Sequence, residues 1–217
     1  MVRGVNEKTP ALRERQVALT EERLVEAATQ LFLRRGYAGT TLAAVAEEAG
    51  LAPRTVYLRF GTKAALFTRT MDVAVVGDTA AVDVAHRDWT QRSLTASTLQ
   101  ERIRIQTQGA RDIMARIGPL LPVAEQAAAV EPDVARAAQA AREDTREHIR
   151  RFWSQAAADE LLPPGVDLDW LADTSAVLCA ADTYLHVTRT FGWSPDAYEQ
   201  WLHTSWRRLL AVAATPV

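Results

Sequence analysis

Cationic and hydroxyl side chains gather in one short segment of the chain, PRTVYLRFGTK. The guanidinium fork of Arg54 can bond two acceptors on the edge of a guanine base. The hydroxyls of Thr55 and Tyr57 can donate to phosphate oxygens, and the positive charges of Arg59 and Lys63 attract phosphate. Base-edge chemistry and phosphate chemistry together are typical of a protein that binds duplex DNA.

Two short helices joined by a glycine turn are predicted to position these residues. Before the turn, apolar residues recur at helical spacing, so one face of the first helix can be buried. These residues are Leu42, Val45, Ala46 and Ala49. A threonine at 40 or 41 can cap that helix, Gly50 suits a left-handed turn, and Pro53 suits the first position of the second helix. The pattern predicts a helix-turn-helix, which places its second helix in the major groove; the alternative is a plain helical hairpin with solvated polar residues.

The stretch GYAGTTLAAVAEEAGLAPRTVYLRFGTKAALF resembles the DNA-binding signature of the TetR family of transcriptional regulators. The resemblance spans roughly residues 20 to 67 and includes a first helix such as 21 to 35, a Gly-Tyr turn and a Phe-x-x-Lys close. It implies that four residues contact phosphates and that two lie near bases. The first group is Thr41, Thr55, Tyr57 and Lys63, and the second is Pro53 and Arg54.

Two positions depart from the pattern of that family. Ala52 stands where members usually have serine or threonine, so the second helix lacks a side-chain cap, typically a difference of ~1 kcal/mol. Arg54 stands where many members have a small residue such as glycine. Its base-reading role is therefore inferred from its own chemistry rather than from the family.

The charge distribution agrees with DNA binding at the N-terminal end. The chain of 217 residues has a formal net charge of −2, but residues 1–63 carry +3 and residues 64–217 carry −5. The basic excess therefore lies with the predicted helix-turn-helix. A single cysteine and the lack of any apolar run approaching ~20 residues predict a soluble cytoplasmic protein, without an internal disulfide or a membrane span.

Only helical periodicity occurs along the chain, so the predicted fold class is all-α. Residues 1–19 lack a clear apolar face and are interpreted as a flexible N-terminal arm, or as an arm that touches the minor groove. Residues 20–66 are assigned to the helix-turn-helix domain and residues 67–217 to a larger helical domain, coupled rigidly through a connecting helix that starts at Lys63. Further helices are predicted at about 98–116, 119–129, 131–158, 167–191 and 195–213, with 86–97 as a loop.

In TetR-like proteins the larger domain binds a small effector, and its last two helices contact a second subunit. The resemblance therefore implies a homodimer and an effector that it does not identify. Three residues combine apolar area with polar tips and are candidates for the effector site, although ordinary core packing explains them as well. They are His148, Trp153 and Tyr184.

The end of the chain is rich in tryptophan, which is typical of a buried dimer contact. An intramolecular core is nearly as good an explanation. The candidates for the dimer interface are Leu178, Leu185, Trp201, Leu202 and Leu209.

No enzyme motif or cofactor motif occurs in the sequence, so no enzyme activity and no cofactor are expected. Cys179 and His186 are two helical turns apart, ~10.8 Å along the axis, which is too far for a hydrogen bond that activates the thiol. The four histidines lack metal-ligand spacing. The sequence predicts a TetR-like repressor that binds a palindromic operator as a dimer and is released by a largely apolar effector. The alternative is a ligand-independent or architectural helix-turn-helix protein.

Overall fold

The computed structural model describes residues 8–80 and 83–213, with side chains from Glu14 onward. In this part of the chain every regular element is helical, which confirms the predicted all-α fold class. The α-helices are α1 (Lys8–Arg35), α2 (Leu42–Glu48), α3 (Pro53–Phe60), α4 (Lys63–Val76), α5 (Asp88–Thr95), α6 (Leu99–Ile117), α7 (Leu121–Ala128), α8 (Pro132–Ala158), α9 (Leu168–Cys179), α10 (Ala181–Phe191) and α11 (Pro195–Ala213). Two 3-10 turns, η1 (Val84–His86) and η2 (Gly118–Leu120), precede α5 and α7.

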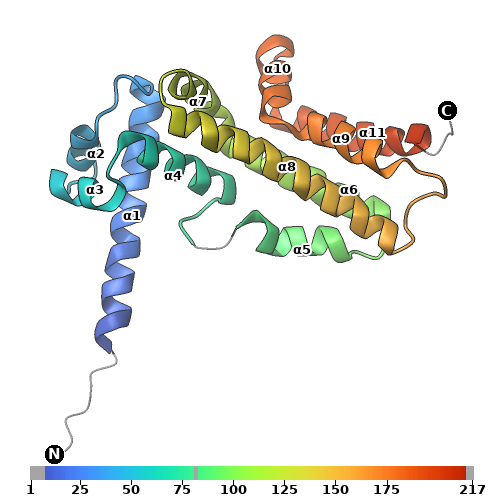
Figure 1. The fold of residues 1–217 in the computed structure, drawn as a ribbon, viewed down its shortest axis with the longest axis horizontal. Helices are drawn as coiled ribbons and strands as arrows, with labels where there is room; N and C mark the ends of the chain where they lie inside the picture. Colours follow the sequence, from blue (N-terminus) through green and yellow to red (C-terminus); the bar gives the residue numbers. More distant parts are fainter. Residues whose placement is uncertain (1–7, 81–82, 214–217) are drawn as a thin grey trace, which may run out of the picture.

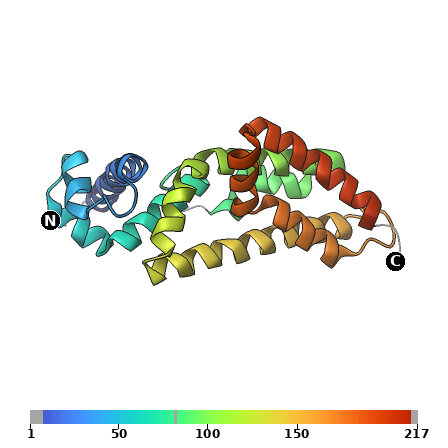
Figure 2. The same cartoon turned by 90° about the horizontal axis from the view of Figure 1, so that it is seen from above.

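The helices form a small head, α1 to α3, and a longer body, α5 to α11 (Figure 1). Helix α4 leads from the head into the body, and the two parts follow one another along the long axis (Figure 2). Within the body, α9 packs along α8, α11 packs along α6, and α5 covers another face of α6. This arrangement places the predicted DNA-binding segment at one end of the molecule.

Helix α1 begins earlier than the sequence analysis predicted. Its start is at Lys8 rather than near residue 21, so residues 8–19 of the predicted arm are helical. The segment contains alanine, leucine, arginine, lysine and glutamine, which are good helix formers, and it needs no apolar face to extend an existing helix. Residues 1–7, with Arg3, and the side chains of Lys8 and Arg13 lie outside the described residues.

Two predictions about the body are wrong. The predicted loop at 86–97 contains α5, whose buried side chains Thr90, Ser93 and Leu94 face the body. The single helix predicted for 167–191 is broken at Ala180, where ψ is 144°. The hydroxyl of Thr183 donates to the carbonyl of Val177 at 2.6 Å and satisfies one of the acceptors that the break leaves free.

Two hydrophobic clusters hold the molecule together. The body cluster centres on Phe152, Trp153 and Trp206, whose ring centroids lie 5.0 to 5.4 Å apart. The head cluster centres on the contacting rings of Phe32, Tyr37 and Phe67. The head cluster also contains four apolar residues from the body, namely Leu120, Val123, Ala127 and Val134. The head and the body therefore share apolar packing in addition to α4. No helix in residues 8–80 and 83–213 is both long and apolar enough to cross a membrane.

Gly109 in α6 allows α5 to pack closely, because an added Cβ would lie 2.3 Å from the ring of Trp89. We therefore expect Gly109→Ala to lower the free energy of unfolding by ~1 to 3 kcal/mol through overpacking. In an open helix the same change would raise stability by ~0.5 to 1 kcal/mol. Urea unfolding of this variant beside the exposed neighbour Gln108→Ala measures the effect. A Gly109→Ala protein as stable as the parent would contradict the packing of α5 on α6.

Candidate nucleic-acid interface

Local signals in the sequence set the bounds of α2 and α3. Thr41 caps α2, and its Oγ1 accepts a hydrogen bond from the amide of Ala44 at 3.1 Å. Gly50 makes the turn with φ +63°, where a residue with a Cβ would be strained. Pro53 is the first residue of α3, and Ala52 before it gives no side-chain cap. The capping threonine, the glycine turn and the missing cap all agree with the predictions from the sequence.

The outward face of α3 carries exposed side chains of different chemistry. Val56 is fully buried and holds the inner face of the helix in the head core. Arg54 and Pro53 are exposed, and the side chain of Arg54 makes no hydrogen bond or ion pair within the described part of the chain. Tyr57 is 53% exposed and Leu58 is 76% exposed. A cation, a phenol and an apolar group are thus presented together at the tip of the molecule.

Two of the residues predicted to contact phosphates, Thr41 and Thr55, have hydroxyl groups that could donate a hydrogen bond. Thr41 is exposed, and in its cap the hydroxyl oxygen accepts a hydrogen bond, so its own proton is free for a phosphate oxygen. Thr55 is half-buried on α3, beside the exposed face. Both threonines lie where the resemblance places phosphate contacts.

Arg59, a predicted DNA contact, has a partner inside the head. It forms a close ion pair with Glu21 of α1, and Arg69 of α4 donates to the other oxygen of the same carboxylate at 2.7 Å. Burial raises the pKa of Glu21, but the two arginines outweigh burial, so the pKa of this carboxyl lies below its ordinary value of 4.5. The buried carboxylate therefore joins α1, α3 and α4. Sequence reasoning missed Glu21 because the contact spans 38 residues.

Lys63 also has partners in the head. Its Nζ donates to the carbonyl oxygen of Tyr37 at 2.9 Å and lies 4.1 Å from the centre of the Tyr37 ring. The ammonium group has three donors, so two remain after this bond. Lys63 is thus held at the start of α4, at the place where a phosphate contact was predicted.

The predicted effector residues are not gathered around one cavity. Trp153 is fully buried in the body cluster, and Tyr184 packs edge-on against Tyr198 at 5.0 Å. His148 lies 3.0 Å from the amide nitrogen of Gln106, and burial, with the nearby charge of Arg151, lowers the pKa of its imidazole. A hollow of about 540 Å³ lies between α6 and α11, but its lining is polar and includes none of the three.

The predicted dimer residues divide into two groups. Leu202 is fully buried and Leu185 is 8% exposed, so both side chains pack in the chain's own core. Leu178, Trp201 and Leu209 are half-buried. Exposed apolar side chains on the same helices had not been singled out from the sequence. They are Trp170 and Val177 on α9, Phe191 on α10 and Val212 on α11.

The cysteine considered from the sequence is buried, and no metal centre is found in the described part of the chain. Cys179 is buried, and burial raises the pKa of its thiol. His186 is exposed and contacts the ring of Phe191. Among residues 8–80 and 83–213 no group of three or more His, Cys, Asp or Glu is placed to hold a metal ion.

Residues 24–70 match the family model of bacterial regulatory proteins, tetR family. Over 54 residues the chain is 39% identical to the HTH-type transcriptional regulator TcmR of Streptomyces glaucescens, which is 25% of this chain and 24% of that protein. The match therefore spans about a quarter of the curated relative's length. The helix-turn-helix segment of the chain is thus similar to that of the tetR family of bacterial regulatory proteins, and the matched relative is a transcriptional regulator.

Solved structures share the fold over most of the chain. A candidate TetR-family regulator of Mesorhizobium loti superposes with a TM-score of 0.66 and 20% identity, covering 90% of this chain and 97% of that one. NalD of Pseudomonas aeruginosa, the secondary repressor of the MexAB-OprM multidrug efflux pump, superposes with a TM-score of 0.61 and 18% identity over 87% and 95% of the two chains. At these identities the likeness shows a shared fold of helix-turn-helix head and helical body.

The ion pairs of Glu21 predict that the stability of the protein depends on pH. Because its folded pKa is lowered, the stabilisation is present above pH ~4.5 and is lost as the pH falls through the lowered folded value. Glu21→Gln should therefore be less stable than the parent at pH 7 by ~1 to 3 kcal/mol, with the difference shrinking toward pH 3. Urea unfolding at both pH values, with the exposed Glu26→Gln as the matched control, measures this. A difference that stays constant with pH would rule out the ionised carboxylate as its cause.

Proposed function

We propose that this protein is a DNA-binding transcriptional regulator that acts as a homodimer on a palindromic operator in the cytoplasm. The observation that carries the proposal is the outward face of α3. Arg54 is exposed and unpaired among the described residues, on a helix whose other faces are fixed by Val56 and by the Arg59–Glu21 pair. A rigid helix that presents a cation at its N-terminal turn suits direct readout in the major groove.

The proposal separates base contacts from phosphate contacts. Arg54, near the start of α3, is assigned to a base edge. Thr41, Thr55, Tyr57 and Lys63 are assigned to phosphates, and Pro53 lies close to the bases. Arg59 is reassigned, because its guanidinium is engaged by Glu21 and supports the position of α3. It is no longer required as a direct contact.

The dimer is proposed to form through α9, α10 and α11. Val177 is 63% exposed, Phe191 is 57% exposed and Val212 is 59% exposed, all on helices of the body that lie away from α3 (Figure 1). Apolar side chains that lie in water on adjacent helices favour burial against a second copy. A two-fold dimer of this kind would present two α3 helices to one face of DNA.

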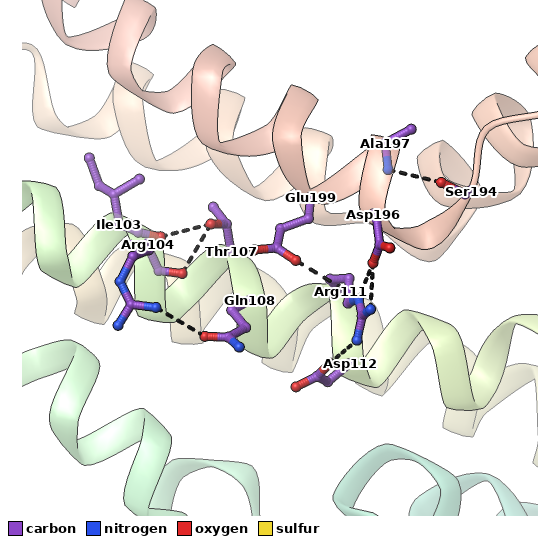
Figure 3. A network of polar contacts seen from close by, with 10 residues as sticks. All are labelled: Ile103, Arg104, Thr107, Gln108, Arg111, Asp112, Ser194, Asp196, Ala197 and Glu199. Atoms are coloured by element: carbon purple, nitrogen blue, oxygen red, sulfur yellow. Dashed lines mark hydrogen bonds and ion pairs between the residues drawn. The ribbon is translucent and has the colours of Figure 1, made fainter.

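Contacts between helices supply a route from the body to the head. Arg116 of α6 donates to the carbonyls of Ala74 and Val75 at 2.8 and 2.6 Å, so it holds the last turn of α4. On the same helix, Arg111 forms a network with Asp112, Asp196 and Glu199, which ties α6 to α11 (Figure 3). A displacement of α6 would therefore also displace α4 and the proposed dimer helix α11.

We further propose that a small, largely apolar effector with a hydrogen-bond acceptor acts on the body and lowers operator affinity. Trp153 Nε1, Trp206 Nε1 and Ser175 Oγ are buried and have no protein partner. An unpaired buried donor costs free energy. A ligand that accepts a hydrogen bond from such a donor would remove this cost, and it would need no charge to do so. These atoms replace His148 and Tyr184 as the polar anchors, since His148 is engaged by Gln106. Operator affinity that no bound compound changes would favour the ligand-independent alternative.

The DNA-binding proposal predicts different failures for two variants. After selection of an operator from random duplexes, Arg54→Ala should relax preference at one base position, at a cost of ~1 to 3 kcal/mol. Lys63→Ala should weaken all sequences alike and reduce the slope of log affinity against log salt by ~0.9, because one counterion release is lost. Fluorescence anisotropy from 50 to 200 mM salt measures both. Lys63 also bonds Tyr37, so melting curves must show that the variant is folded. Two variants that bind like the parent would refute the assignment.

The dimer proposal predicts that a charge on α9 separates the subunits. Val177→Asp should weaken association by roughly 2 kcal/mol or more, because the carboxylate would be buried at the contact. The matched control is Val130→Asp, which changes a 70% exposed valine between α7 and α8. Sedimentation at micromolar concentration reads the mass of both. A Val177→Asp protein that remains a dimer would exclude this face.

A further inference from the structure

Leu58 is the most exposed large apolar side chain in the described part of the chain, with 76% of its surface open. A single exposed leucine is ordinary on a protein surface, so its exposure alone indicates no function. The position of Leu58 on α3 is more informative. Leu58 lies four residues after Arg54 on α3, which puts the two side chains on one face of the helix, beside the exposed ring of Tyr57.

The backbone that presents Leu58 is held firmly. Val56 is fully buried in the head cluster, and Arg59 is paired with the buried Glu21. Phe60 is half-buried, and α3 ends at Gly61 with φ +71°. With the flanking residues fixed in this way, Leu58 cannot turn inward without unpacking the head. The side chain of Leu58 therefore contacts any molecule that binds to the outer face of α3.

We propose that Leu58 contacts the 5-methyl group of a thymine in the major groove, so that the protein reads a T·A pair by apolar contact. The inference rests on the proposed function. The thymine methyl is the apolar feature of the major-groove edge, and a leucine side chain has neither a donor nor an acceptor for the other groups there. A phosphate is an unsuitable partner for the same reason.

The helix geometry limits where this thymine lies. Four residues of α-helix span ~6 Å, and base pairs are stacked ~3.4 Å apart. The thymine read by Leu58 is therefore within about two base pairs of the position read by Arg54. A second copy of the chain is a poorer occupant, because the exposed apolar residues proposed to form the dimer lie on α9 to α11, in the body and away from α3 (Figure 1).

The test removes the methyl group and the leucine separately. An operator is first selected from random duplexes with the full-length protein, and each thymine is then replaced in turn by deoxyuridine, which lacks only the 5-methyl group. At one position in each half-site the parent should bind the uracil duplex ~4-fold more weakly, the effect of one buried methyl-sized group. Leu58→Ala should bind the thymine and uracil duplexes equally at that position. Leu58→Met should restore the discrimination.

Val130→Ala is the matched control and should discriminate as the parent does, because Val130 is 70% exposed in the body. A parent that shows no thymine-over-uracil preference near the Arg54 position overturns the proposal. A Leu58→Ala protein that keeps the thymine-over-uracil preference of the parent also overturns the proposal. This includes the case in which Leu58→Ala lowers the affinity for both duplexes by the same factor, which would indicate a sugar contact. In each of these outcomes a specific operator is still bound, so the proposed function stands. Failure to select any sequence would instead refute the proposed function, and this inference with it.

Discussion

Four apolar side chains from η2, α7 and α8 complete the hydrophobic core of the head: Leu120, Val123, Ala127 and Val134. They lie with the rings of Phe32, Tyr37 and Phe67, and none of the seven is more than 6% exposed. Each fully buried large side chain is worth ~1.5 to 3 kcal/mol as an upper estimate. The head therefore cannot tilt freely about α4, because tilting would expose this shared core. The orientation of α3 depends on where the body places α7 and α8.

Arginine side chains connect the helices that this core brings together. Arg23 donates to the carbonyl of Ala49 at 2.6 Å and closes the end of α2. Arg59 and Arg69 meet at Glu21, and Arg116 closes the end of α4. Besides any stability that they contribute, these contacts fix the positions of α1, α2, α3 and α4 relative to one another. The basic excess of the head consequently overstates the charge that is free to meet DNA.

The body combines tight packing with unpaired polar atoms. Trp89 lies against Gly109, and the two indoles Trp153 and Trp206 have ring centroids 5.2 Å apart. Both indole nitrogens lack a protein partner, as does the hydroxyl of Ser175. An interior that was only structural would gain stability from apolar groups at these positions. The proposed effector contact rests on these donors, and α6 contacts both α11, which carries Trp206, and α4.

The sequence by itself determined the local features of this protein. Capping by Thr41, the turn at Gly50, the start of α3 at Pro53 and the outward position of Arg54 follow from backbone and helix-face rules that act over a few residues. These short-range signals also identified the helix-turn-helix and the all-α class.

Only the tertiary structure decided which residues meet across the chain. It paired Arg59 with Glu21, buried Leu202 in the chain's own core, and made a helix of the polar segment Asp88–Thr95 by placing it on α6. It also broke the helix at Ala180, where no glycine or proline signals an end. Such outcomes depend on contacts between residues far apart in the sequence, and the free energy of those contacts exceeds the small local preferences that a sequence pattern displays.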